Sequence, residues 1–254
     1  MNSITAKTGW TWIANGYSIF RKRPFLLTNL FFGYMIGSMA LGVIPFLGQI
    51  LPLVIIPAFT LLFMQACYRI DADNYVSFGE LFNVFNRKLF YRLLLLGSLY
   101  LLYALLLSVI AILVDGGLSL GAVSQQVQPE LTSSQQIKMV LTFALLIALY
   151  IPFAMAVWYA APLIGWQKMS IGKAVFFSFF AVLRTLKTFL VYIFCWVVLG
   201  FILPVIVGSI LILVGGQQLM VFVLMILFVI LSILAYCSFY PTYKDVFGQP
   251  DNDN

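Results

Sequence analysis

The sequence predicts an all-α, polytopic membrane protein whose six transmembrane helices form three hairpins, each preceded by a short helix at the cytoplasmic surface. Hydrophobic residues make up 63% of the 254 positions and charged residues only 9%, whereas a soluble domain carries about 25% charged residues. So few charges cannot cover a water-facing surface, and the mean hydropathy of +1.05 indicates that lipid is the main solvent. We expect residues 1–254 to form a single integral membrane domain.

Each transmembrane helix is predicted from a run without charged residues. A helix needs about 20 apolar residues to cross a bilayer, and the runs 24–68 and 188–243 are each long enough for two helices joined by a turn. The segments "IPFLGQ" (44–49) and "VGGQQ" (214–218) supply turn-forming residues at these two places. The predicted spans are 24–44, 46–68, 93–114, 139–166, 189–214 and 219–240.

The basic residues predict the orientation of these spans. Lys and Arg resist translocation, and 13 of the 14 basic residues fall in the N-terminal segment, the 69–92 loop, the 167–188 loop or the C-terminal tail. Only Lys138 remains for the other side. We therefore expect both termini in the cytoplasm, the loop 115–137 outside, and a disordered tail at about 248–254. The net charge of +6 follows from this topology, so no nucleic-acid partner is expected.

The opening stretch, "GWTWIANGYSIFRKRPF", predicts the first surface helix. Its polar residues recur at intervals of three and four, and its aromatic residues suit the headgroup layer of a membrane. A bend is expected at Arg23, because Pro24 disfavours helical backbone in the residue before it. The predicted membrane-interface residues are Trp10, Trp12, Tyr17, Arg21, Lys22 and Arg23.

This stretch has two other interpretations besides a surface helix. Packing of the helix against the cytoplasmic ends of the bundle is compatible with an interfacial position. Cleavage as a signal peptide after Ala40 is disfavoured, because the signal would be unusually long.

The same kind of segment recurs twice along the chain. "SFGELFNVFNRKLF" (77–90) has one polar and one phenylalanine-rich face, and "SIGKAVFFSFFAVLRTLK" (170–187) begins with the same Ser-x-Gly pattern. An Ile-Pro pair also recurs at a similar offset. The sequence thus predicts internal repeats of a surface helix and a helical hairpin. The three repeat-like units are about 9–68, 77–166 and 170–240.

The composition argues against most catalytic chemistry. With no histidine, the chain has no Ser-His or Cys-His pair and no His-containing metal site. No Asp or Glu lies in a predicted span, which argues against a carboxylate proton relay. We therefore expect a non-enzymatic protein with no catalytic residue, no cofactor and no metal.

Two groups of residues leave narrower alternatives to that expectation. Cysteines within spans are usually small packing residues and rarely metal ligands; here they are Cys67, Cys195 and Cys237. An enzymatic or cation site is conceivable only at the cytoplasmic rim, although acids in such loops are usually just solvated. The acids there are Asp71, Asp73 and Glu80.

Uncharged polar residues and prolines interrupt the predicted spans. Interhelical hydrogen bonds and plain kinks explain most such residues, but paired broken helices also mark the binding sites of transporters. The candidate helix-break or pocket residues are Asn29, Gln49, Pro57, Gln65, Pro152, Trp158, Pro162 and Pro204.

Several stretches carry a resemblance to a known family. They are "GWTWIANGYSIFRKRP", "VIPFLGQILPLVIIPAF", "PFAMAVWYAAPLIGW", "SIGKAVFFSFFAVLRT" and "YPTYKDVFG". Together they resemble a family of uncharacterised proteobacterial inner-membrane proteins with an N-terminal Gly-Trp-x-Trp-Ile signature. The resemblance covers nearly the whole chain and implies six helices in the cytoplasmic membrane. It implies no catalytic residues.

Two classes of function follow. The first is a scaffold, assembly factor or partner-binding module in the inner membrane, acting through its cytoplasmic surface helices on a membrane-protein partner or a second copy. The alternative is a transporter or channel for a hydrophobic or neutral solute, including lipid handling. Both place the chain in contact with the lipid bilayer.

Overall fold

The fold is built from helices throughout the part of the chain that the structure describes. The computed structural model describes residues 5–45, 48, 50–74, 78–123, 132–213 and 217–250. The elements are α1 (Thr8–Lys22), α2 (Pro24–Gly42), α3 (Leu51–Asp71), α4 (Phe78–Phe82), α5 (Arg87–Asp115), α6 (Leu118–Val123), α7 (Ser133–Val157), α8 (Ala160–Gly165), α9 (Ile171–Arg184), α10 (Leu186–Val197), the π-helical turn η1 (Val198–Ile202), α11 (Leu203–Leu213) and α12 (Gln217–Phe247).

Six helical stretches are long and apolar enough to cross a bilayer, which confirms the predicted all-α, polytopic membrane class; the arrangement in three hairpins, each with a preceding surface helix, stays a prediction. They are Pro24–Gly42, Leu51–Asp71, Arg87–Asp115, Ser133–Gly165, Leu186–Leu213 and Gln218–Phe247. The turns predicted at 44–49 and 214–218 lie partly outside the described residues. Gln49 and Ser77 lie wholly outside them.

Several of these helices extend past the apolar runs from which they were predicted, α5 and α12 among them. Helix α5 begins at Arg87, because the Asn86 side chain accepts a hydrogen bond of 2.7 Å from the Leu89 N–H and caps the helix. Helix α12 continues through Pro241 to Phe247. The length of a charge-free run therefore underestimates the length of a helix that continues past its apolar part.

The first helix ends where the sequence predicts. Helix α1 covers Thr8–Lys22, and Arg23 leaves the helical region with φ −144° and ψ 63° before Pro24 opens α2. The predicted hinge at Arg23 is confirmed. The buried face of α1 consists of Gly9, Trp12, Ile13, Gly16 and Ile19, and it packs against α12 and α10.

The core lies where α1, α3, α8 and the last turns of α12 meet. The largest fully buried side chains there include Trp12, Phe63, Tyr159, Tyr240 and Tyr243. Aromatic rings contact one another throughout this region, mostly edge to face, as between Trp12 and Phe189 with ring centroids 5.3 Å apart.

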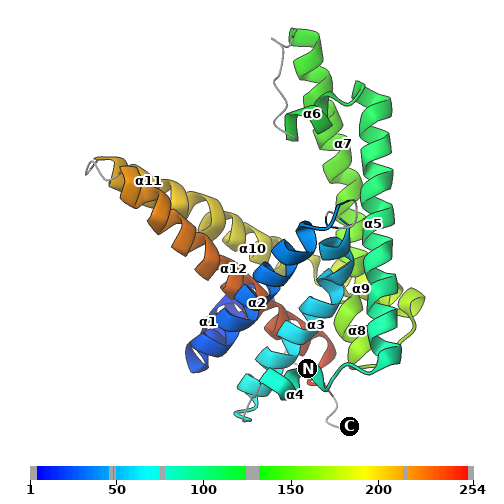
Figure 1. The fold of residues 1–254 in the computed structure, drawn as a ribbon, viewed down its shortest axis with the longest axis vertical. Helices are drawn as coiled ribbons and strands as arrows, with labels where there is room; N and C mark the ends of the chain where they lie inside the picture. The colour runs from blue at the N-terminus through cyan, green and yellow to red at the C-terminus, as the bar shows by residue number, and fades with distance from the viewer. Residues whose placement is uncertain are drawn as a thin grey trace.

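Two long hairpins extend from this core in different directions (Figure 1). One consists of α5 and α7 with α6 near its tip, and the other of α10, η1 and α11 packed along α12. These hairpins bury few side chains inside the protein, so their apolar surfaces are available to lipid.

Prolines shape the helices that they interrupt. Pro57 and Pro152 lie inside α3 and α7. Pro204 follows the π-helical turn η1, which accommodates the carbonyl that a proline leaves without a donor. Trp158 ends α7, and Pro162 lies buried in the short helix α8.

Candidate functional site

A cavity of about 730 Å³ lies at one end of the molecule, which we call the basic end. This end is formed by the C-terminus of α3, the N-terminus of α5 and the α8–α9 connection. Four basic side chains line the cavity: Arg69, Lys88, Arg92 and Lys168. Four side-chain amides also line it: Gln65, Asn74, Asn83 and Asn86. No acid lines the cavity among the described residues.

Three separate segments position these side chains. The last turns of α3 carry Gln65 and Arg69, which lie four residues apart on one helix face. The first turns of α5 carry Lys88 and Arg92, with the same spacing. Because the N-terminus of a long helix bears a partial positive charge, α5 adds its dipole to the two cations.

Gln65 is held in place by the neighbouring segment. The Trp166 indole N–H donates a hydrogen bond of 2.7 Å to the Gln65 Oε1 atom. Since the amide oxygen is occupied, the Gln65 NH₂ group is left to donate elsewhere. Gln65 and Trp166 both line the cavity.

Lys168 reaches the cavity from a strained backbone. It has a φ of 53° in the connection between α8 and α9. The left-handed region costs a residue other than glycine about 1–2 kcal/mol. Such strain persists where the surrounding structure fixes the conformation, and it concentrates at ligand sites.

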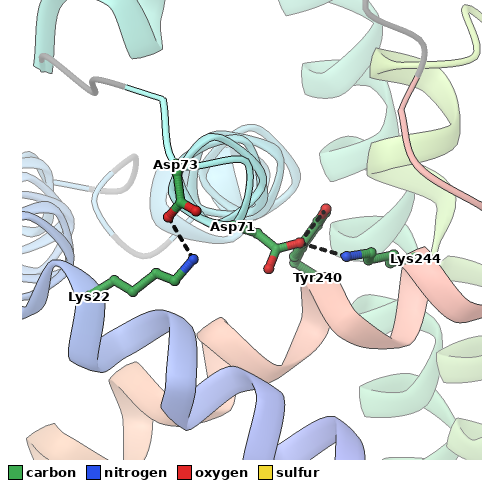
Figure 2. Close-up of polar contacts among 5 residues, drawn as sticks. All are labelled: Lys22, Asp71, Asp73, Tyr240 and Lys244. Carbon is green, nitrogen blue, oxygen red and sulfur yellow. Dashed lines mark hydrogen bonds and ion pairs between the residues drawn. The ribbon is translucent and has the colours of Figure 1, made fainter.

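Each described acid at the basic end has a hydrogen-bond partner, as Figure 2 shows for two of them. Asp71 accepts a 2.7 Å hydrogen bond from the Lys244 ammonium and a 3.3 Å bond from the Tyr240 hydroxyl. Asp73 pairs with Lys22 at 2.7 Å. These pairs connect α1, α3 and α12.

The two other described acids at this end are also engaged. Glu80 pairs with the Arg69 guanidinium at 3.1 Å, and Asp245 accepts a 2.7 Å bond from the Trp12 indole N–H. Asp71, Asp73 and Glu80, the acids of the predicted rim, therefore each have a basic partner. Within the described residues they form no cluster with a third metal-ligating side chain.

This distribution leaves uncompensated positive charge in the cavity. Lys88, Arg92 and Lys168 form no ion pair within the part of the chain that the structure describes. Asp251 and Asp253 follow the cavity-lining Pro250 in sequence and lie outside the described residues. A general bias of basic residues to one side of the membrane does not require that they converge, whereas here four of them share one cavity with amide donors. The arrangement suits an anion.

The structure distributes the sequence-predicted residues over different environments. Of the helix-break candidates, Gln65 lines the basic cavity and Asn29 lines a second, apolar cavity. Of the interface candidates, Trp12 is fully buried in the protein, whereas Trp10 and Tyr17 are half-exposed. The Arg21 guanidinium lies 5.8 Å from the centre of the Tyr17 ring. The position of α1 relative to a membrane stays a prediction.

Sequence reasoning did not identify the basic cavity. It assigned Arg69, Lys88, Arg92 and Lys168 to two cytoplasmic loops and used them only to orient the spans. Their convergence depends on the packing of α5 and α8 beside α3, which no local pattern encodes. The available signal was the Asn86 cap, since it places Lys88 and Arg92 in the first turns of a helix.

Comparison with known proteins finds a relative that covers nearly the whole chain. No family model and no solved structure matches the chain. A relative in Burkholderia thailandensis, named "Probable inner membrane protein BTH_II0599", is 31% identical over 252 residues, which cover 96% of this chain and 93% of the relative.

Six membrane-spanning helices and a basic end define a polytopic, all-α integral membrane protein. The chain belongs to the same family as the Burkholderia inner membrane protein. The predicted N-terminal signature of the family stays a prediction.

Proposed function

We propose that this protein is a non-enzymatic inner-membrane module that binds a phosphate-bearing anion at its basic end, in the manner of a lipid-handling protein. The observation that carries the proposal is the convergence of Arg69, Lys88, Arg92 and Lys168 in one cavity with four amides. Basic pockets between transmembrane helices bind the phosphates of lipid headgroups.

The donor set supports a phosphate-bearing ligand. Arginine presents a planar fork of N–H groups that matches phosphate oxygens, and lysine adds a compact charge. The N-terminus of α5 favours an anion at the same place. The described lining offers cations, amides and aromatic rings but no carboxylate or thiol, and this excess of hydrogen-bond donors supports the binding of an anion.

Of the two classes of function predicted from the sequence, the cavity favours lipid handling over a scaffold. A scaffold has no need of a concave site in which three cations form no ion pair within the described residues. We also infer from the basic residues that the cavity opens to the cytoplasm, where anionic headgroups of the inner leaflet are within reach.

Titration with lipid tests the proposal. The full-length protein in a non-ionic detergent is titrated with phosphatidylglycerol and, separately, with phosphatidylcholine of the same chain length, and bound lipid is counted by native mass spectrometry. We expect a preference for phosphatidylglycerol that weakens with salt. Replacing Lys88, Arg92 and Lys168 by Gln should lower the affinity on the order of 100-fold at low salt, because each basic residue contributes about 1 kcal/mol.

A matched control removes three other basic residues from the same side of the chain. Lys173, Arg184 and Lys187 are exposed and do not line the cavity, so replacing them by Gln changes the net charge equally. We expect this variant to bind phosphatidylglycerol as the natural chain does. Equal losses in the two variants, or none in the first, would contradict a site in the cavity. Replacing Asp251 and Asp253 by Asn should leave binding unchanged or stronger, because it removes two acids.

A further inference from the structure

A second cavity, of about 670 Å³, lies between α2 and α3 and is bordered by α4. Its lining is almost entirely apolar, and we call it the α2–α3 groove. On α2 the groove extends from Asn29 to Leu41 and passes Gly33 and Gly37, which are exposed. With a rise of 1.5 Å per residue, this stretch is about 18 Å long. One leaflet of a bilayer has a hydrocarbon layer of about 15 Å, so the groove is as long as an acyl chain in one leaflet.

The groove and the basic cavity follow the same face of α3. Ile55, Ala58 and Leu62 line the groove, and Gln65 and Arg69 line the basic cavity. The intervals between these residues alternate between three and four, so all five share one side of the helix. Along that side, apolar surface within the span changes to amide and cation at the helix end, which is the order of tail and headgroup in a phospholipid.

The segment between α4 and the first turn of α5 separates the two cavities. Phe82, Phe85 and Phe90 line the groove, while Asn83 and Asn86 line the basic cavity. Phenylalanine rings thus face the apolar side of this segment and amides face the cationic side. A lipid held at both places would lie with its glycerol region against this segment.

We propose that an anionic glycerophospholipid occupies both cavities, with its phosphate in the basic cavity and one acyl chain in the α2–α3 groove. This inference rests on the proposed function and adds the source of the phosphate, a membrane lipid and not a free phosphate compound. The Gly33-x-x-x-Gly37 spacing would also admit a helix from a second copy. The adjoining cations favour the lipid, because the basic cavity would gain nothing from a second apolar helix.

Photocrosslinking tests the position of the chain. The full-length protein is reconstituted in vesicles of phosphatidylcholine with a trace of phosphatidylglycerol that carries a diazirine halfway along one acyl chain. After irradiation, the labelled peptides are identified by mass spectrometry. We expect α2 and α3 to be labelled more strongly than the lipid-exposed helices α10 and α11. The same diazirine on phosphatidylcholine should give no such excess.

The glycines allow the groove to be filled without disturbing the fold. A Cβ atom added at Gly33 or Gly37 meets no heavy atom within 4 Å, so Gly33→Leu with Gly37→Leu projects two side chains into open space. Gly42, at the end of the same helix, is equally open and does not line the groove. We expect the double variant to lose the excess labelling of α2 and α3 and Gly42→Leu to keep it.

The outcomes separate this inference from the proposed function. If the double variant keeps the excess labelling while the Lys88, Arg92 and Lys168 variant loses its preference for phosphatidylglycerol, the groove inference fails and the headgroup site stands. If the basic variant behaves as the natural chain does, the proposed function fails. Crosslinking of two copies through α2 would assign the groove to a second copy and overturn the inference.

A second measurement needs no variant. On the natural chain, phosphatidylglycerol with six-carbon chains should displace the long-chain lipid much less well than phosphatidylglycerol with sixteen-carbon chains. Glycerol 3-phosphate should displace it least. Equal displacement by all three would assign the site to a free phosphate group and overturn the inference.

Discussion

Lys168 has a strained backbone and a charged side chain that lines the basic cavity. Mutation can separate these two properties. At a φ of 53°, glycine adopts the native conformation without the clash that a Cβ atom causes. Lys168→Gly should therefore leave the free energy of unfolding unchanged or raise it by up to about 1 kcal/mol, since the gain is offset in part by the entropy of glycine in the unfolded chain. Binding of phosphatidylglycerol should fall about fivefold.

Lys168→Ala is the control, because it removes the same charge and keeps the strain. Binding should fall as in the glycine variant, whereas the thermal unfolding temperature in detergent should stay at or below that of the natural chain. A glycine variant less stable than the alanine variant would show that the conformation at this position is not strained.

Trp10 and Trp12 lie two positions apart in the same helix and have opposite environments. Trp12 is 0% exposed and bonded to Asp245, whereas Trp10 is 53% exposed. Trp12→Ala should cost about 3–5 kcal/mol of unfolding free energy, because it leaves a cavity against Phe189 and Tyr192. Trp10→Ala should change the stability by less than about 1 kcal/mol. Thermal unfolding in detergent measures both, and equal losses would contradict the observed packing of α1.

At the level of helices, the sequence predicts what depends on local pattern. Charge-free runs identify all six spans, and the proline rule identifies the hinge at Arg23. The start of α5 at Arg87 and the extension of α12 to Phe247 are missed, because a cap and a buried polar helix end leave no apolar run. The buried side of α1 is also missed, since helical spacing alone does not say which side meets α12.

The sequence alone does not predict the candidate site, for a related reason. Each basic residue of the cavity is visible in the sequence, but three segments must pack together before they share a space. The sequence identifies Asn29 and Gln65 as polar residues within spans, and the structure assigns them to two different cavities. Only the folded structure shows that the residues lining both cavities lie along one face of α3.

The crossing of α3 and α5 depends on Gly97. A Cβ atom at this position would overlap the Val54 carbonyl group, so the two backbones are in direct contact. Gly97→Ala should force the helices apart and destabilise the protein by about 1–3 kcal/mol, despite the higher helix propensity of alanine. Gly33→Ala is the matched control, because its Cβ meets open space and should be neutral or slightly stabilising. A Gly97→Ala variant as stable as this control would contradict the close crossing.

For the molecule as a whole, the basic residues at one end either form ion pairs or line the cavity, and Arg69 does both. Lys22, Lys244 and Arg69 pair with acids, two of these pairs connecting α1 and α12 to the end of α3. Lys88, Arg92 and Lys168 are left facing the cavity. The pairs connect the helices, whereas these three cations, which form no ion pair within the described residues, are the charges that the proposed anion site requires.

The orientation is itself a prediction that the fold makes testable. The segments predicted to be cytoplasmic meet at the basic end, and α6 lies far along the α5–α7 hairpin from it (Figure 1). In a chain whose three cysteines are replaced by serine, a cysteine at position 125 should react with a membrane-impermeant maleimide from outside, and one at Asn74 only after the membrane is opened. Basic residues hold short loops in the cytoplasm, so replacing Arg21, Lys22 and Arg23 by Gln should weaken this asymmetry. Reaction of position 125 only from the cytoplasmic side would overturn the six-span topology and would move the basic cavity away from the leaflet that the lipid proposal requires.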